Sequence, residues 1–262
     1  MARIVSVANQ KGGVGKTTTT INLAASLALA EQRVLLVDVD PQGNLTSGVG
    51  QKGKAGARGT IYEALTSIEP QSDFLSFTIP TNIDRLYIVP ADRNLTGAEI
   101  ELVPLARREE RLRVLLAGAR EDFDYILIDC PPSLGLLTLN ALVAADAVII
   151  PLHCEYFALE GLADLVGTMR RVRGALNPSL DIEGVLLTMF DDRTKLGQQV
   201  ASEVRQFFKE KVYRTVIPRN VRLGEAPSHG LPVVLYDAKS RGAEAYLALA
   251  REVLERSTAT AA

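Results

Sequence analysis

One short stretch, residues 10–18, constrains the fold of this chain more than any other part of its sequence. It places three glycines and two lysines between a short β-branched run and a long helical pattern. Glycines let a backbone curl so that its N–H groups point inward, and a helix that begins there adds positive partial charge. Such a loop between a strand and a helix is typical of phosphate-binding sites. The fold must therefore contain a strand that leads directly into a helix, as open α/β sheets do.

The residues of this loop indicate how it would hold a nucleotide. In the common P-loop, G-x-x-x-x-G-K-[ST], the lysine reaches the β- and γ-phosphates and the hydroxyl binds Mg²⁺. Lys16 and Thr17 stand at those positions, but Gln10 replaces the first glycine and a second lysine, Lys11, follows it. Since Lys16 supplies the cation within one chain, Lys11 is better placed to reach the nucleotide of another subunit. We expect the phosphates to lie against Lys11, Gly12, Gly13, Val14, Gly15, Lys16, Thr17 and Thr18.

Three acids at the ends of apolar runs complete the expected site. Asp38 and Asp40 follow the run 34–37, and Asp129 follows the run 125–128. An acid at the end of a buried strand must be paired or bound to metal, because an isolated buried charge is costly. We expect Asp129, with Thr17, to lie on the Mg²⁺ side and Asp38 near the waters of the metal. We expect Asp40 to face the γ-phosphate and orient the attacking water, so that Lys11, Lys16 and Asp40 are the candidate catalytic residues.

The rest of the chain alternates short β-branched runs with longer helical patterns. The expected strands are 4–8, 34–37, 86–89, 125–128, 147–151, 182–189 and 212–217. The expected helices are 17–30, 107–119, 136–144, 159–176, 198–209 and 243–254. Several strands are apolar throughout, as strands covered by helices on both faces are. The pattern predicts one α/β domain over 1–262, a doubly wound, mostly parallel sheet, with a loop at 48–59 and a frayed tail after residue 256.

The composition of the chain limits which classes of function remain open. The chain has 262 residues, with 29 Lys and Arg against 31 Asp and Glu, so any binding to nucleic acid must come from a local basic patch. Cys130 and Cys154 are too far apart in sequence for a close-spaced metal pair. There is no signal-peptide core, and Asp146 interrupts the longest candidate for a bilayer span, which needs about 20 apolar residues. We expect a cytoplasmic protein without a membrane anchor.

At the level of motifs, the chain resembles the ParA/MinD group of P-loop ATPases, whose deviant loop is K-G-G-x-G-K-[ST], and within it the ParA/Soj partition proteins. The resemblance extends from the first strand to near Leu254. The motifs that carry it are Ala8 to Thr18, Asp38 to Asn44, Ile128 to Ser133, Cys154 to Gly161, Ile217 to Arg222 and Glu225 to Gly230.

Membership of this group implies an activity and partners. It implies an ATPase whose homodimer encloses two ATP molecules with Mg²⁺, with Lys11 reaching the partner's phosphates and Asp40 supporting hydrolysis. It implies nonspecific binding of the dimer to double-stranded DNA, a nucleoid-associated location, and a ParB/Spo0J-type protein that stimulates hydrolysis. By position, Met189 and Pro218 are expected to wall the adenine pocket. Because the chain begins at its first strand, we expect no separate N-terminal DNA-binding domain and no operator binding.

A basic segment is the expected DNA surface. Residues 191–222 hold eight Lys or Arg and four acids, a local net charge of +4 in a chain of net charge −2. The resemblance places DNA-binding arginines at Arg193 and Arg222, and Arg219 is a neighbouring candidate. Arginines on phosphates give affinity without sequence information.

Other functions remain open from sequence alone. A related ATPase that positions another cargo fits the same motifs. A membrane-positioning ATPase of the MinD type needs an amphipathic C-terminal helix with a basic face. The last helical pattern, 243–256, is instead rich in alanine and balanced in charge. A metabolic relative or an iron protein is a third class, and the latter needs cluster-binding cysteines from two subunits.

Overall fold

A single sheet organises the part of the chain that the computed structural model describes, residues 1–67, 73–155 and 158–261. Its strand order is β3-β4-β2-β5-β1-β6-β7. All neighbouring pairs are parallel except β3 and β4. The strands are β1 (Arg3–Val7), β2 (Val34–Asp38), β3 (Ile79–Pro80), β4 (Leu86–Val89), β5 (Tyr125–Asp129), β6 (Ala147–His153) and β7 (Asp181–Thr188).

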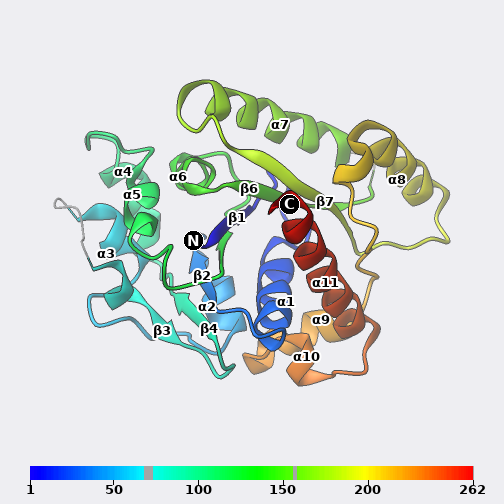
Figure 1. Ribbon diagram of the computed structural model, residues 1–262, viewed down its shortest axis with the longest axis horizontal. Coiled ribbons are helices and arrows are strands. Elements are labelled where there is room, and N and C mark those ends of the chain that lie inside the picture. Colours follow the sequence, from blue (N-terminus) through cyan, green and yellow to red (C-terminus); the bar gives the residue numbers. More distant parts are fainter. Residues whose placement is uncertain (68–72, 156–157, 262) are drawn as a thin grey trace.

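Helices cover both faces of this sheet, and α1 and α11 lie side by side on one of them (Figure 1). The α-helices are α1 (Lys16–Leu29), α2 (Asn44–Gly48), α3 (Ile61–Thr66), α4 (Leu95–Glu101), α5 (Arg111–Ala117), α6 (Leu136–Ala144), α7 (Ala158–Ala175), α8 (Lys195–Phe208), α9 (Val221–Glu225), α10 (Val233–Tyr236) and α11 (Arg241–Ala261). Short 3-10 helices occupy η1 (Phe74–Phe77), η2 (Lys209–Lys211) and η3 (Ala226–His229).

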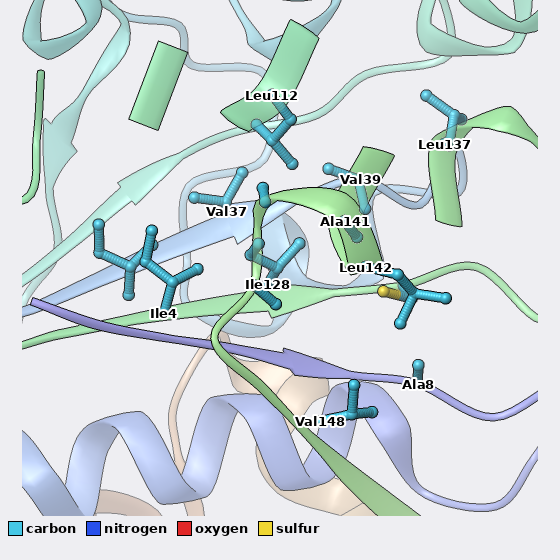
Figure 2. Packing of buried hydrophobic residues seen from close by; sticks show 14 of the residues in the cluster. Ile4, Ala8, Val37, Val39, Leu112, Ile128, Leu137, Ala141, Leu142 and Val148 are labelled. Carbon is cyan, nitrogen blue, oxygen red and sulfur yellow. The ribbon is translucent and has the colours of Figure 1, made fainter. Parts of the chain in front are cut away.

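Two apolar layers explain why the strands are hydrophobic on both sides. Within β2, Leu35 and Val37 belong to the layer beneath α5, α6 and α7, whereas Val34 and Leu36 belong to the layer beneath α1 and α11. Figure 2 shows the first layer, in which Val37 and the neighbouring strand residues pack toward Leu112 of α5 and the side chains of α6. A strand buried on both faces carries apolar side chains at every position, as the sequence pattern predicts.

The predicted strand at 212–217 is wrong. This segment forms no ladder with β7: the N–H groups of Tyr213 and Ile217 donate to β7 carbonyls at 3.0 and 2.9 Å, and the only bridges among the described residues are isolated ones, from Val212 to β7 and from Pro218 to Phe190. Between them, the backbone N–H groups of Arg214 and Thr215 donate to the carboxylate of Glu252 on α11, at 2.9 and 3.0 Å. Because a side chain takes the hydrogen bonds that a neighbouring strand would need, the ladder cannot form despite the β-branched sequence.

The other predicted strands and helices are present, most with shifted ends, whereas β3 and the short helices α2, α3, α4, α9 and α10 were not predicted. The helix predicted at 107–119 begins only at Arg111, since Arg107 has a φ of 52° and lies in a preceding turn. The loop predicted at 48–59 follows the short helix α2, whose last residue is Gly48. The last helix extends beyond 254 to Ala261, and the side chains of the predicted frayed tail after residue 257 lie outside the described residues.

Candidate functional site

Neighbouring strands bring the phosphate-loop sequence and the acids together. Along the sheet, Val7 of β1 pairs with Asp129 of β5, and Asp129 pairs with Asp38 of β2. The loop after β1 therefore begins at the same sheet edge where both acids end their strands. This is the carboxyl edge, where ligands bind in open α/β sheets.

The loop between β1 and α1 is curled around its glycines. Gly15, directly before α1, has a φ of 88°, and Gly13 has a φ of 71°, a region that side chains with a Cβ rarely enter. The curl buries Lys16, whose ammonium donates to the carbonyl oxygen of Lys11 at 3.1 Å. Burial lowers the pKa of Lys16, with Asp129 the leading opposing influence. The loop thus holds a desolvated cation at the N-terminus of α1, an arrangement that suits an anion.

A cavity of about 360 Å³ opens over this loop. Its volume lies within the range of about 300–1,000 Å³ typical of ligand sites. Its lining residues come from the loop, from the segment after β2, and from the ends of β5 and β7: Gly12, Gly13, Gly15, Lys16, Thr17, Thr18, Asp40, Gln42, Asn44, Pro132 and Met189. Val14 belongs to the loop but is buried beneath it, and its carbonyl oxygen accepts from the Thr188 hydroxyl at 2.8 Å.

The carboxylates of Asp129 and Asp38 are fully buried beneath this cavity. Asp129 accepts from the Thr17 hydroxyl at 2.7 Å and from the Thr20 hydroxyl at 3.3 Å. Asp38 accepts from both the backbone N–H and the hydroxyl of Thr46, at 2.9 and 2.7 Å. Burial raises the pKa of Asp38 to about 6, and burial together with the Asp38 charge raises the pKa of Asp129 well above its usual range. A nearby positive charge favours the ionised form of such buried acids, so this pair of carboxylates suits a cation.

Asp40 occupies a different position from these two acids. Its carboxylate lines the cavity and accepts from the backbone N–H of Gln42 at 2.9 Å. Its backbone N–H donates to Asp38 at 3.2 Å. The sequence Asp-Val-Asp therefore places one acid beneath the cavity and the other on its wall.

Lys11 points away from the cavity that its own loop forms. Its ammonium pairs with Glu155, at 2.7 Å between Nζ and Oε2, and Lys11 is not among the described residues that line the cavity. The expected separation of the two lysines is therefore present within one chain, with Lys16 inside and Lys11 outside.

Comparison with known proteins places this geometry in a family. A family model described as an AAA domain matches residues 2–182. The chain is 58% identical over 258 residues to the chromosome partitioning protein ParA of Myxococcus xanthus, covering 98% of this chain and 90% of the relative. It is 57% identical over 253 residues to the sporulation initiation inhibitor protein Soj of Bacillus subtilis, covering 97% and 98%. The chain belongs to the ParA/Soj family of ATPases.

Solved structures confirm the doubly wound P-loop fold of this family member. A Mycobacterium smegmatis protein described as cobyrinic acid a,c-diamide synthase, solved with an ATP analog and magnesium, is 37% identical with a TM-score of 0.84. The match covers 98% of this chain and 96% of that one. The cell division ATPase MinD of Pyrococcus furiosus is 26% identical with a TM-score of 0.78, covering 98% and 99%.

Of the two residues predicted to wall the adenine pocket of this ParA/Soj chain, one lines the loop cavity and the other lies beside it. Met189, with a φ of 48°, lines the loop cavity and also a neighbouring one of about 380 Å³. Pro218 is bridged to Phe190, which lines that neighbouring cavity. Both residues therefore lie at the β7 side of the loop cavity, and their contact with a base stays a prediction.

Two of the predicted DNA-binding arginines share one region. Arg193 lies between β7 and α8, is 86% exposed at its side chain, and pairs with Asp191 at 2.6 Å. Arg219 lines the neighbouring cavity together with Asp191. The positive charge of Arg219 also helps lower the pKa of Asp191, behind the larger effect of Arg193.

The third predicted arginine is held separately. Arg222, in α9, pairs with Glu225 at 2.7 Å and with Asp237 at 3.2 Å. Its acidic partners thus differ from Asp191, with which Arg193 pairs. The role of all three arginines on DNA stays a prediction.

Sequence reasoning missed several residues of the site. Gln42, Asn44 and Pro132 line the cavity, although no role was expected of them. Gln42 and Asn44 belong to a motif that carries the family resemblance, which is the signal that points to them. Nothing in the local pattern indicates that Thr46 holds Asp38. The motif residues Tyr156 and Phe157 lie outside the described part of the chain.

The last helix bears on the membrane question. In α11, Tyr246, Leu249 and Val253 are buried against the layer that includes α1, and the Tyr246 hydroxyl lies 3.2 Å from that of Thr19. None of the described helices combines the length and the apolar character that a membrane crossing requires.

Proposed function

We propose that this chain is an ATP-dependent dimerising ATPase that binds DNA without sequence preference and drives chromosome or plasmid segregation. The observation that carries the proposal is the placement of two lysines on opposite sides of one phosphate loop, in a chain at least 55% identical to named ParA proteins over almost its whole length. One lysine serves the subunit's own nucleotide and the other is available to a second subunit.

The donor set fits a nucleotide with Mg²⁺. Hard divalent cations prefer oxygen ligands, and Mg²⁺ keeps several waters beside one or two carboxylates and the phosphates of the substrate. The Thr17 hydroxyl and the buried carboxylates of Asp129 and Asp38 supply such oxygens. In the proposed complex, the phosphates of the nucleotide and bound waters complete the coordination of the ion. When bound, Mg²⁺ neutralises phosphate charge.

The protein side chains then have separate tasks in hydrolysis of ATP to ADP and phosphate. Lys16 and the N–H groups of residues 12–18 bind the phosphates, and Lys11 binds those of the partner subunit. Asp40, on the cavity wall, orients the attacking water. A cation supplied by a second subunit is worth about 10³–10⁵ in rate for related phosphoryl transfers. Basal turnover is therefore weak until the dimer is complete, and a ParB/Spo0J-type protein stimulates it.

Dimerisation also explains how ATP controls DNA binding. Arg193, Arg219 and Arg222 are exposed in a segment of net charge +4. Nonspecific binding through phosphate contacts is weak, with dissociation constants of about 10⁻⁴–10⁻⁶ M, and falls steeply with salt. A dimer joins two such surfaces, so its affinity exceeds that of one subunit without any new contact. ATP thereby brings the protein to the nucleoid.

One experiment tests this function directly. Binding of the purified protein to a DNA duplex of random sequence is measured with ATP, with ADP and without nucleotide, across a series of salt concentrations. We expect binding only with ATP, decreasing with salt, and none for Lys16→Ala. Equal binding in all three nucleotide states contradicts the proposal.

Two further measurements, of binding to liposomes and of DNA segregation, separate the alternative functions. Sedimentation with vesicles in the presence of ATP would indicate a membrane-positioning ATPase of the MinD type. The burial of α11 against α1 argues against this, since the apolar residues Leu249 and Val253 are already covered. ATP-dependent DNA binding without any effect on segregation would indicate another cargo.

A further inference from the structure

The contact between Lys11 and Glu155 has no role in the function proposed above. The ammonium of Lys11 lies 2.7 Å from Oε2 of Glu155, and Oε1 lies 3.0 Å from Nδ1 of His153. The hydrogen bond from Lys11 lowers the pKa of the Glu155 carboxyl, so the carboxylate is charged at neutral pH. In the single subunit, the lysine expected to reach a second subunit is therefore already occupied.

Both ends of this ion pair are anchored in the sheet. The backbone N–H of Lys11 donates to the side chain of Asn9 at 3.0 Å, and the buried Asn9 donates to the Pro151 carbonyl of β6 at 2.8 Å. Glu155 lies two residues beyond the end of β6, with its N–H donating to the carbonyl of His153 at 2.8 Å. Because β1 and β6 are neighbouring strands, the backbone itself brings the two charges together.

In the single subunit, Lys11 lies beside the start of α7, where a Cβ added at Gly161 would lie 3.9 Å from the Cβ of Lys11. In the proposed dimer, its ammonium extends instead to the triphosphate of a second subunit. A carboxylate that remained beside the lysine would repel that triphosphate, since like charges at close range are unfavourable.

We propose that Glu155 is a positioning residue that holds Lys11 in the single subunit, so that ATP-driven dimerisation has to open this ion pair. The inference rests on the proposed function, because it assumes that Lys11 acts on the partner's nucleotide. Glu155 then sets the protein concentration at which ATP produces dimers, and it keeps subunits apart when ATP is scarce.

The size of the effect follows from the exposure of the pair. The side chains of Lys11 and Glu155 are 32% and 49% exposed. An exposed ion pair shifts an equilibrium by up to about fivefold, and a dimer must open two of them, so the combined effect reaches at most about 25-fold. Removing the carboxylate is therefore expected to lower the dimer dissociation constant by about tenfold.

The test measures dimerisation by sedimentation velocity with Mg²⁺ and a non-hydrolysable ATP analogue. The chains compared are wild type, Glu155→Gln, Glu160→Gln and Lys11→Ala. Glu160 is the matched control, an exposed acid in the first turn of α7. Glu155→Gln should dimerise about tenfold more tightly than wild type, and Glu160→Gln should equal wild type. A control measures the affinity of each chain for a fluorescent ATP analogue at dilutions where the chain is monomeric. Normal affinity shows that the subunit is folded and still binds nucleotide.

Salt supplies a readout that a merely structural role would not change. The advantage of Glu155→Gln should shrink as salt rises toward 1 M, where the Debye length falls to about 3 Å, close to the 2.7 Å that separates the wild-type pair. If Glu155→Gln binds nucleotide normally but dimerises no more tightly than wild type, or if its advantage is independent of salt, the inference is wrong. If wild type does not dimerise, or Lys11→Ala dimerises equally well, the proposed function itself fails.

Discussion

At the scale of single residues, the site depends on acids that are held ready for a cation. Asp38 is fully buried and accepts hydrogen bonds from Thr46 and Asp40, yet its pKa is raised because burial outweighs those bonds. Burial therefore disfavours the ionised form of Asp38 more than its hydrogen bonds favour it. A ligand that binds only the folded state stabilises it, so a bound cation would couple the stability of the subunit to occupancy of its site.

The first prediction concerns Asp38 and pH. A carboxyl whose pKa rises from 3.8 to about 6 on folding favours the folded state while protonated, so stability is lost as the pH rises through about 6. A rise of roughly two pKa units corresponds to about 3 kcal/mol. Asp38→Asn removes this loss, so its free energy of unfolding relative to wild type should increase by about 1–3 kcal/mol between pH 4 and pH 7.

Urea denaturation without nucleotide, at a series of pH values, measures this difference. The exposed Glu121→Gln is the control and should differ from wild type by the same amount at every pH. A flat difference for Asp38→Asn as well would mean that Asp38 ionises freely within the fold.

The second prediction separates Asp40 from the buried acids. Asp40 lines the cavity, and its carboxylate accepts from Gln42. Asp40→Asn keeps an acceptor for that N–H but removes the charge that would orient the attacking water. Groups in such roles contribute about 10²–10⁴ in rate. Single-turnover hydrolysis should therefore slow by that factor, with ATP still bound and dimers persisting; unchanged turnover would remove Asp40 from the mechanism.

At the scale of elements, the position of the loop depends on how α1 packs. Tyr246 of α11 is fully buried, and its hydroxyl lies 3.2 Å from that of Thr19, one turn beyond Lys16. Loss of a buried aromatic ring costs about 3–5 kcal/mol, whereas loss of one hydrogen bond costs about 1 kcal/mol. Tyr246→Ala should lower the free energy of unfolding by the larger amount and Tyr246→Phe by the smaller.

Chemical denaturation measures both variants, and nucleotide affinity is measured below their transitions. We expect Tyr246→Phe to bind nucleotide as wild type does, because the ring still holds α1 in place. Equal losses of stability for the two variants would mean that the hydroxyl, and not the ring, fixes the helix.

Six strands and the phosphate loop were predictable because their signals are local. An apolar run covered on both faces, followed by glycines and a helix, specifies β1 and α1 without help from the rest of the chain. The segment 212–217 has an equally β-branched sequence, but its backbone bonds to Glu252, about 40 residues further along. No local sequence pattern can reveal that Glu252 competes with β7 for this backbone. The two-residue strand β3 was missed for another reason: it contains Pro80 and has no alternating pattern.

The residues of the site also divide into those that the sequence predicts and those that it does not. The lysines and acids could be picked out of the sequence because the lysines belong to the glycine-rich loop and the acids lie at or just after strand ends, next to residues whose chemistry is evident. Their partners were not, because Thr46 reaches Asp38 across a loop and Glu155 reaches Lys11 from a different strand end. Contacts between residues that only the fold brings together cannot be predicted from the spacing of those residues in the sequence.

At the scale of the whole molecule, the proposed function requires a chain with a small negative net charge to bind DNA. The chain carries a net charge of −2, and several cations of the basic segment are paired with acids, as Lys211 is with Asp181 and Arg214 with Glu255. Exposed pairs of this kind contribute little energy, so phosphates can replace the acids. Affinity must then come from a few arginines repeated in two subunits and from the release of counterions.

The last prediction concerns Arg222, which is exposed in α9 and paired with Glu225 and Asp237. Each phosphate contact adds about 0.9 to the slope of log affinity against log salt. A dimer has two copies, so Arg222→Ala should reduce that slope by about two while ATP-dependent dimerisation is unchanged. Arg222→Glu should abolish binding at moderate salt, because it places a third acid beside Glu225 and Asp237. Fluorescence anisotropy with a labelled duplex of random sequence measures both.

The matched control for these variants is Arg93→Glu, an equal change of charge at an exposed residue shortly before α4. Helix α4 lies far from α9 in Figure 1. If affinity followed net charge alone, Arg93→Glu and Arg222→Glu would weaken binding equally. If Arg222 contacts phosphate, only its own variants change the slope, because counterion release counts contacts and not total charge. An unaltered slope in Arg222→Ala would exclude this arginine from the DNA surface and leave Arg193 and Arg219 as its candidates.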